Sequence, residues 1–264
     1  MTLTHGELIR QVRLDKGLTQ KNVYAGIISK SFAIKFEKGK HNVAAPLLLE
    51  ILDRISMDID EFLFVHRNYH LTDQSAYTVR YAKHSNSHNL SELRRMLSEF
   101  ITQSDSSPIS KVRVAEVRSR IRLIEHLTDT GDYDPSVILP KDRQTIVDYL
   151  TNLHTWTLQE IQLFANNLEL ITPELQLVFF RTLSKSLNQY ADYDRGRDIY
   201  CGLLLNLIHE TIQTNELSYT AQLLDQLEAF STEYKEVYYR ITAKFFRGIL
   251  AIKRGQTHEG LRKA

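Results

Sequence analysis

A dense cluster of basic and hydroxyl side chains lies near the start of the chain. Residues 10–40 carry eight basic and only two acidic residues, which gives this stretch a formal charge of +6. Residues 41–66 carry one basic and five acidic residues, so the two stretches have opposite signs. A cationic surface of this kind can neutralise phosphate groups and release their counterions. A run of charge alone is more often a solvated face, so the pattern around it must decide.

The pattern around Ser29 predicts two short helices joined by a tight turn, over 19–26 and 30–37. This is the arrangement of a helix-turn-helix, whose second helix directs its N-terminal residues at base edges in the major groove. The apolar seam between the helices is expected to comprise Leu18, Val23, Ile27, Ala33 and Phe36. The candidate DNA-binding residues are Arg13, Gln20, Lys21, Ser29, Lys30, Ser31, Ile34, Lys35 and Lys38.

Different contacts are expected within this set. Lys30 and Ser31 are placed to read bases, and Ile34 to touch a thymine methyl group. Lys35 and Lys38 would reach the phosphate backbone on either side. Each role follows from its position along the second helix.

Two further candidates lie on the neighbouring helices. Gln20 stands in the first turn of its helix, where free N–H groups and a side-chain amide can meet a phosphate. Arg13 and Glu37 are better explained as an ion pair that ties the first helix to the end of the second, with Arg13 also near a phosphate.

The rest of the chain has an ordinary composition. Its 264 residues are 42% hydrophobic and 25% charged, which is typical of globular proteins and enough for two units. The single cysteine, Cys201, excludes an intrachain disulfide and fits a reducing compartment. The sequence contains neither the apolar run of a signal peptide nor that of a membrane helix. We therefore expect a cytoplasmic protein.

An all-α fold is predicted, because glycine and proline are few and apolar residues recur three and four apart. In residues 1–66, Gly17 and Gly39 fall where helices must end, and Ser29 and Asp58 fall where helices begin. The five helices predicted for this domain are 5–16, 19–26, 30–37, 45–54 and 58–66.

The second part of the chain is predicted to be a stack of longer helices. A connector helix and loop over 67–88 lead into a helical-repeat domain over 89–264. Short joins between the helices favour antiparallel pairs and an α-solenoid, with a degenerate tetratricopeptide-like fragment near Ala243, Phe246 and Gly248. The predicted helices are 90–106, 109–127, 136–151, 156–170, 174–191, 195–214, 217–231 and 233–254, followed by a last partial helix.

Four sequence stretches resemble one known family. GELIRQVRLDKGLTQ, ISKSFAIKFEKG and LLLEILDRISMDIDEFLF look like the Rgg/GadR/MutR regulators of Gram-positive bacteria, which begin with an Xre/Cro-type helix-turn-helix. DYLTNLHTWTLQEIQLFANNLEL is similar to that family's pattern of Asp-Tyr-Leu, Trp, Glu and Leu-x-x-Asn. The resemblance covers the whole chain, densely in the first 66 residues and sparsely later.

This resemblance implies a short peptide pheromone, held in a concave groove of the helical repeats. An extended peptide has unpaired backbone groups, and an Asn side chain presents both a donor and an acceptor. Asn166, at the family's Leu-x-x-Asn, is the first candidate, with Asn167 beside it. Asn206 interrupts an apolar helix face and is either a structural bridge or a ligand contact.

Two charged residues complete the candidate peptide site. Arg80 could pair with a peptide carboxylate. The resemblance implies that relatives that take acidic peptides carry Arg where this chain has Glu169, so a less acidic or a basic peptide is expected here.

Other side chains are given structural roles. Arg113, Arg118, Arg120 and Arg122 are expected to form a solvated face, Trp156 a packing anchor and Cys201 a small core residue. The pairs His66/His70 and His84/His88 lack a third ligand, and catalytic or nucleotide-binding motifs are missing. We expect no enzyme activity, no cofactor and no metal.

The leading hypothesis is a homodimeric, peptide-responsive transcription regulator that binds an inverted repeat in double-stranded DNA. One alternative is a helical-repeat interaction module whose N-terminal domain docks a protein partner. Another is a regulator of the same fold with a non-peptide ligand. Duplex binding through about six cations should weaken steeply with salt, whereas protein docking need not.

Overall fold

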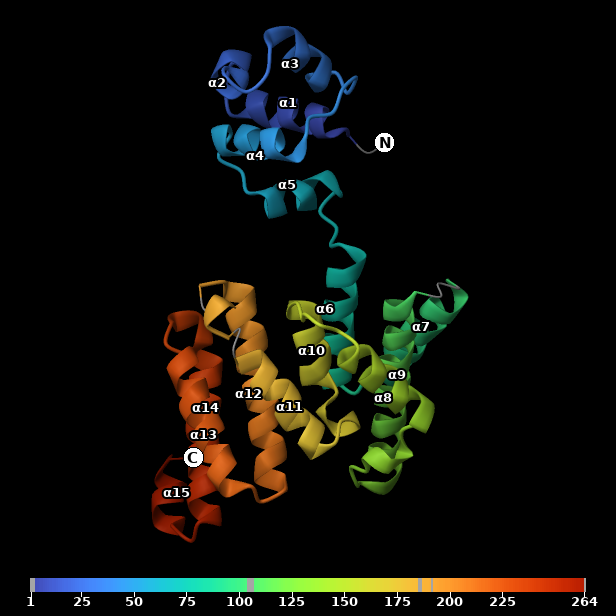
Figure 1. The fold of residues 1–264 in the computed structure, drawn as a ribbon, viewed down its shortest axis with the longest axis vertical. Helices are drawn as coiled ribbons and strands as arrows, with labels where there is room; N and C mark the ends of the chain where they lie inside the picture. Colours follow the sequence, from blue (N-terminus) through green and yellow to red (C-terminus); the bar gives the residue numbers. More distant parts are fainter. Residues whose placement is uncertain (1–2, 104–106, 185–186, 191, 264) are drawn as a thin grey trace. The chain divides into compact units, whose positions relative to one another are not determined.

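A computed structural model describes residues 3–103, 107–184, 187–190 and 192–263. These residues form fifteen α-helices and four short 3₁₀ helices, and no strand occurs among them (Figure 1). The predicted all-α class is confirmed. Two compact units are distinguished, an N-terminal unit of Met1–Lys83 and a C-terminal unit of His84–Ala264.

The N-terminal unit contains the five predicted helices, each within about two residues of the predicted ends. Thr4 and Thr19 begin α1 and α2 with reciprocal capping boxes, and the hydroxyl of Ser29 accepts the Phe32 N–H at the start of α3. Asp58 precedes α5 but makes no side-chain cap. The helices are α1 (His5–Asp15), α2 (Gln20–Tyr24), α3 (Lys30–Glu37), α4 (Ala45–Arg54) and α5 (Ile59–His66), followed by α6 (Asp73–Asn86), which extends into the next unit.

Two glycines end helices in this unit as the sequence predicts. Gly17 and Gly39 have φ values of +68° and +69°, a left-handed conformation that favours glycine. The hydrophobic core of this unit is made by apolar residues from α1 to α5, among which Ile9, Phe36 and Phe62 have no exposed surface. Burial of these side chains packs α1, α3 and α5 around one core.

Nine α-helices follow in the C-terminal unit. Most neighbours along the chain pack together, including α7 with α8, α8 with α9, and each consecutive pair from α12 to α15, whereas α10 packs against α12. The helices are α7 (Leu90–Thr102), α8 (Pro108–Thr130), α9 (Pro140–Thr151), α10 (Leu158–Asn166), α11 (Pro173–Ser184), α12 (Asp194–Gln213), α13 (Leu217–Phe230), α14 (Val237–Lys253) and α15 (Thr257–Lys263).

Several predicted helices of this unit are shorter than expected. The predicted helix over 136–151 is a 3₁₀ turn followed by α9, because Pro140 starts the helix and holds Leu139 in an extended conformation. The predicted helix over 156–170 ends at Asn166 and continues as a 3₁₀ turn. Two predicted ends, residue 106 and residue 191, lie outside the described residues.

One large core spans the C-terminal unit from α8 to α14. Trp156 packs against Phe164 and Phe179, with ring centroids 5.8 and 4.9 Å apart, so its predicted anchoring role is confirmed. Cys201 is fully buried, as predicted, and burial raises the pKa of its thiol to about 12. None of the described helices is long and apolar enough to span a bilayer.

The tetratricopeptide-like fragment forms the crossing of α14 and α15. Ala243 and Gly248 are buried, and Gly260 of α15 sits so close to α14 that a Cβ there would lie 2.7 Å from the Gly248 carbonyl oxygen. Small residues at these positions therefore allow the two backbones to approach closely.

Candidate functional site

Helices α2 and α3 cross at a closely packed seam. Val23, Ala33 and Phe36 are almost completely buried, and Leu18 and Ile27 pack against them, so the predicted seam is confirmed. The intervening turn passes through Gly26 at a φ of +83°. The result is a helix-turn-helix whose second helix has one buried face and one exposed face.

The exposed face of α3 carries the candidate base-reading residues. Lys30 and Ser31 are exposed in its first turn, and the Ser31 hydroxyl lies 3.2 Å from that of Ser29. Ile34 follows one turn later with 38% of its surface exposed. Exposed positions in the first two turns of the second helix are those that reach base edges in this motif.

Three lysines surround this face. Lys21 is exposed on α2, Lys35 is exposed on α3, and Lys38 is exposed directly after it. A hollow of about 280 Å³ lies between α2 and α3 and has Lys21 and Lys30 in its lining, with Tyr24 and Ala33. The structure thus gathers the lysines and hydroxyls of the candidate set on accessible parts of α2 and α3.

A buried polar network is centred on Glu37, the last residue of α3. Its carboxylate accepts hydrogen bonds from Arg13 Nε (2.6 Å) and Nη2 (2.9 Å), from Gln20 Nε2 (2.7 Å) and from the Tyr24 hydroxyl (2.8 Å). Burial alone would raise the pKa of Glu37, but the hydrogen bonds from these three residues outweigh it and hold the pKa below its usual value. One ionised carboxylate therefore ties α1, α2 and α3 together.

The ion pair predicted between Arg13 and Glu37 is confirmed. Arg13 is only 7% exposed, and its remaining guanidinium nitrogen donates to the Leu18 carbonyl oxygen at 2.7 Å. These interactions hold the Arg13 guanidinium inside the unit, largely away from solvent and from a bound duplex. Gln20 is half-buried and its amide nitrogen is engaged with Glu37, which leaves its backbone as the group available to a phosphate.

A second polar cluster lies in the C-terminal unit and joins α8 to the end of α10. Asn167 is 1% exposed, and its Nδ2 donates to Glu116 Oε1 and to the Leu163 carbonyl oxygen, both at 2.8 Å. Asn166 is half-buried and its Nδ2 lies farther from the same Glu116 oxygen, at 3.4 Å. The two neighbouring asparagines therefore differ, one locked in the interior and the other loosely held.

Glu169 belongs to the same cluster and is paired. Arg120 Nη2 lies 2.9 Å from Glu169 Oε1 and also donates to the Asn166 carbonyl oxygen at 2.8 Å. Asn206 of α12 is exposed, and its Nδ2 donates to the Ala165 carbonyl oxygen at 2.8 Å. Asn206 thus bridges α12 to α10 in the structure.

Arg80, the remaining candidate for peptide binding, lies on a different helix and in a different unit from these residues. It is half-buried on α6, at a position assigned to the N-terminal unit, and its side chain is not free of interactions. The four other candidates for peptide binding all belong to the C-terminal unit.

The prediction of a solvated arginine face on α8 is wrong. Arg118 makes a bidentate pair with the buried Asp142, Arg120 pairs with Glu169, and Arg122 donates to the Val137 carbonyl oxygen. Arg113 is half-buried and also interacts. Arg118, Arg120 and Arg122 hold α8 to the segments that follow it, because their partners lie 15 to 49 residues away in the chain.

Glu116 is the member of the cluster that sequence reasoning missed. It is 2% exposed and occupies the buried seam of α8 between Val112 and Leu123. A carboxylate at an apolar position of an amphipathic helix is the signal that could have revealed it, since a buried charge requires polar partners.

Together the two units assign the chain to a class of protein, the helix-turn-helix proteins that also contain a helical-repeat unit. The family described as HTH-type transcriptional regulator Rgg, C-terminal domain, matches residues 94–264. The solved structure of a protein from Listeria monocytogenes EGD-e, described as a candidate transcriptional regulator, is 36% identical, with a TM-score of 0.89 over 100% of this chain and 89% of that one. The chain belongs to the Rgg family of transcriptional regulators, a family without enzyme activity.

Two more distant structures share the fold. The SHP pheromone receptor Rgg2 of Streptococcus dysgalactiae is 18% identical, with a TM-score of 0.74 over 98% of this chain and 90% of that one. PrgX in complex with cCF10 is 16% identical, with a TM-score of 0.70 over 98% and 89%. The helix-turn-helix and helical-repeat layout predicted from sequence is confirmed by these matches.

Proposed function

We propose that the protein is a sequence-specific DNA-binding transcription regulator whose activity is set by a short peptide. The observation that carries the first half is the exposed N-terminal face of α3, with Lys30, Ser31 and Ile34, on a helix whose last residue, Glu37, is bonded to α1 and α2. A rigid support of this kind lets side chains meet base edges at low entropic cost. A homodimer would place two such helices about one duplex turn apart, on an inverted repeat.

Variants of α3 should separate base reading from phosphate binding. Lys30→Ala with Ser31→Ala should lower affinity for the operator by about 30-fold or more and leave affinity for random duplex nearly unchanged, because each lost base contact gives discrimination of about 1–3 kcal/mol. Lys38→Ala should weaken all duplexes alike and reduce the salt slope by about one. Fluorescence polarisation with operator and scrambled duplexes, at several salt concentrations, measures both effects.

The matched control is Lys244→Ala, which removes an exposed lysine from α14 in the other unit. It should change neither affinity. Equal losses on operator and random DNA for both α3 variants would mean that α3 does not read bases. Duplex binding without salt dependence would favour the protein-docking alternative.

The peptide half of the proposal rests on the polar cluster and on the fold. A peptide backbone needs donors and acceptors, and Asn166, Asn206 and the Arg120–Glu169 pair offer them on half-buried or exposed side chains. Rgg2 is named as a pheromone receptor, and PrgX was solved with cCF10. Since Arg120 neutralises Glu169, the pair has no net charge, and a screen of short peptides should select neutral sequences over strongly charged ones.

The two adjacent asparagines provide a test of this site. Asn167→Ala should lower the free energy of unfolding by about 1–3 kcal/mol, because it removes a 2.8 Å hydrogen bond to the buried Glu116 carboxylate and the bond to the Leu163 carbonyl oxygen. Asn166→Ala should change stability by less than about 0.5 kcal/mol but weaken the selected peptide about tenfold. Thermal unfolding and fluorescence polarisation with that peptide measure the two quantities, with the exposed Asn152→Ala as control. Unchanged peptide affinity in Asn166→Ala would remove Asn166 from the site.

A further inference from the structure

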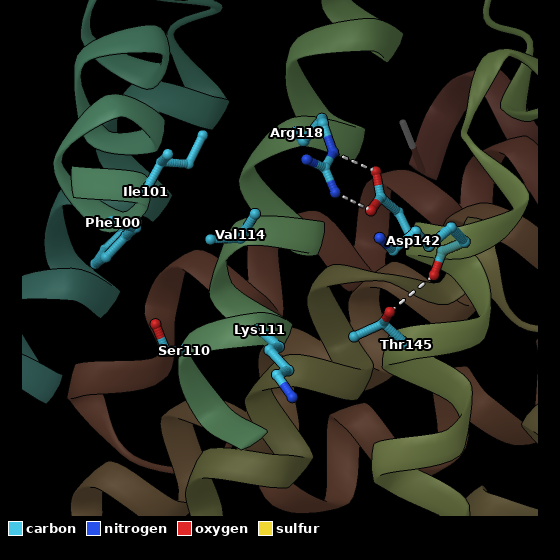
Figure 2. A pocket seen from close by; sticks show the side chains of 9 residues that line it. Phe100, Ile101, Ser110, Lys111, Val114, Arg118, Asp142 and Thr145 are labelled. Carbon is cyan, nitrogen blue, oxygen red and sulfur yellow. Dashed lines mark hydrogen bonds and ion pairs between the residues drawn. The ribbon is translucent and has the colours of Figure 1, made fainter. Parts of the chain in front are cut away.

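A cavity of about 470 Å³ lies between α7, α8 and α9 of the C-terminal unit (Figure 2). It shares no residue with the polar cluster around Glu116. Its volume falls in the range of small-molecule sites. The lining residues are Phe100, Ile101, Ser110, Lys111, Val114, Arg118, Lys141, Asp142 and Thr145.

One side of the cavity is apolar. Phe100 and Ile101 come from the last turns of α7, and Val114 of α8 lies between them and the Arg118–Asp142 pair in Figure 2. Ile101 is 58% exposed, so a large aliphatic surface borders the cavity and meets water. A hydrocarbon group placed there would cover that apolar surface and release its water, which favours binding.

The other side carries cations without matching anions. Lys111 and Lys141 are exposed, and neither ammonium group makes a hydrogen bond or ion pair with the residues that the structure describes. Asp142, the one acidic residue of the lining, is 1% exposed and is bound by Arg118 through hydrogen bonds of 2.7 and 2.5 Å. Among the described residues, no carboxylate pairs with the two lysines, which therefore leave a positive charge at the rim.

We infer that this cavity is a binding site for a small amphipathic organic anion, with a carboxylate held between Lys111 and Lys141 and an aliphatic body against Ile101 and Val114. A neutral apolar molecule would leave the lysines unused, and a small inorganic anion would leave the apolar wall in water. A medium-chain fatty acid has the required chemistry and about the required size. The inference does not depend on the proposed peptide site.

Helix α8 connects this cavity with the polar cluster. Val114 and Arg118 face the cavity, whereas Glu116 and Arg120, two residues along from each, point about 200° away around the helix at 100° per residue. An anion in the cavity can therefore influence the cluster through α8. It does so only if α8 has two alternative positions and the anion binds the protein more tightly in one of them.

Octanoate is a suitable probe, measured with the full chain by isothermal titration calorimetry. An affinity of about millimolar or tighter is expected for a ligand of this size. Octanol and acetate, which lack the charge and the hydrocarbon body respectively, should each bind at least tenfold more weakly. Lys111→Gln with Lys141→Gln should weaken octanoate at least tenfold, and Ile101→Ser should weaken octanoate but not acetate.

Two control variants locate the probe. Lys244→Gln, which removes an exposed lysine of α14, and Asn166→Ala should both leave octanoate affinity unchanged. Absence of octanoate binding at millimolar concentration, equal affinity for octanol, or unchanged affinity in the double lysine variant would each overturn the inference. A loss in Asn166→Ala equal to that in the double variant would place the probe at the polar cluster and would overturn it as well.

Discussion

Glu37→Gln is expected to lower the free energy of unfolding of the N-terminal unit by about 3–5 kcal/mol. Glutamine keeps the shape of the side chain but removes the charge that offsets the buried Arg13 guanidinium, which is 7% exposed. It also replaces one of two acceptor oxygens by a donor, which then faces donors from Arg13, Gln20 or Tyr24. An unpaired buried charge and a donor–donor contact are both costly.

Hydrogen exchange of the amides in α1 and α3, followed by mass spectrometry on the full chain, measures this loss. Protection of the slowest amides should fall about 100-fold or more. Glu50→Gln removes an exposed carboxylate of α4 and should leave protection unchanged. Arg13→Met combined with Glu37→Leu should recover much of the loss, because it removes both charges. A change of less than about 0.5 kcal/mol in Glu37→Gln would show that the network does not support the unit.

Gly6→Ala is expected to destabilise the same unit by about 3 kcal/mol or more. In an exposed helix this substitution usually stabilises, since alanine is the better helix former by about 1 kcal/mol. Gly6 is buried in the first turn of α1 against the end of α3, and a Cβ there would overlap the Phe36 carbonyl oxygen and lie 2.5 Å from its carbon. Backbone atoms cannot rotate away, so α1 and α3 must separate.

The same substitution at Gly202 gives a control of opposite sign. Gly202 lies inside α12, and the nearest atom to an added Cβ is the Tyr239 hydroxyl at 3.9 Å. Gly202→Ala should therefore stabilise by about 0.5–1 kcal/mol. Exchange protection in α1 and α12 reports each variant in its own unit. Equal effects of both variants would mean that helix propensity, and not the contact with α3, decides.

Local signals explain why much of the fold is predictable from the sequence. Gly17 and Gly39 end helices and Ser29 begins one through interactions within a few residues, so their sequence neighbourhood suffices. The Arg13–Glu37 pair could also be predicted, because a helix-turn-helix brings the first and third helices together.

Contacts between distant residues explain what the sequence leaves open. Asn167 and Glu116 are 51 positions apart, and only the packed C-terminal unit shows that one satisfies the other. Gly6 must lack a Cβ because the Phe36 carbonyl group of α3 lies against it, and no pattern of side chains in the sequence predicts that contact. Likewise, the arginines of α8 have the spacing of a solvated face, and their partners become visible only in three dimensions.

The buried thiol of Cys201 makes the protein convenient for spectroscopy. It is the single cysteine of the chain, has no exposed surface, and stays protonated at neutral pH because its pKa is about 12. Maleimide reagents, which attack exposed thiolates, should therefore leave the native chain unlabelled. A cysteine introduced at an exposed site in either unit could then carry a fluorophore or spin label alone, without first removing the natural one.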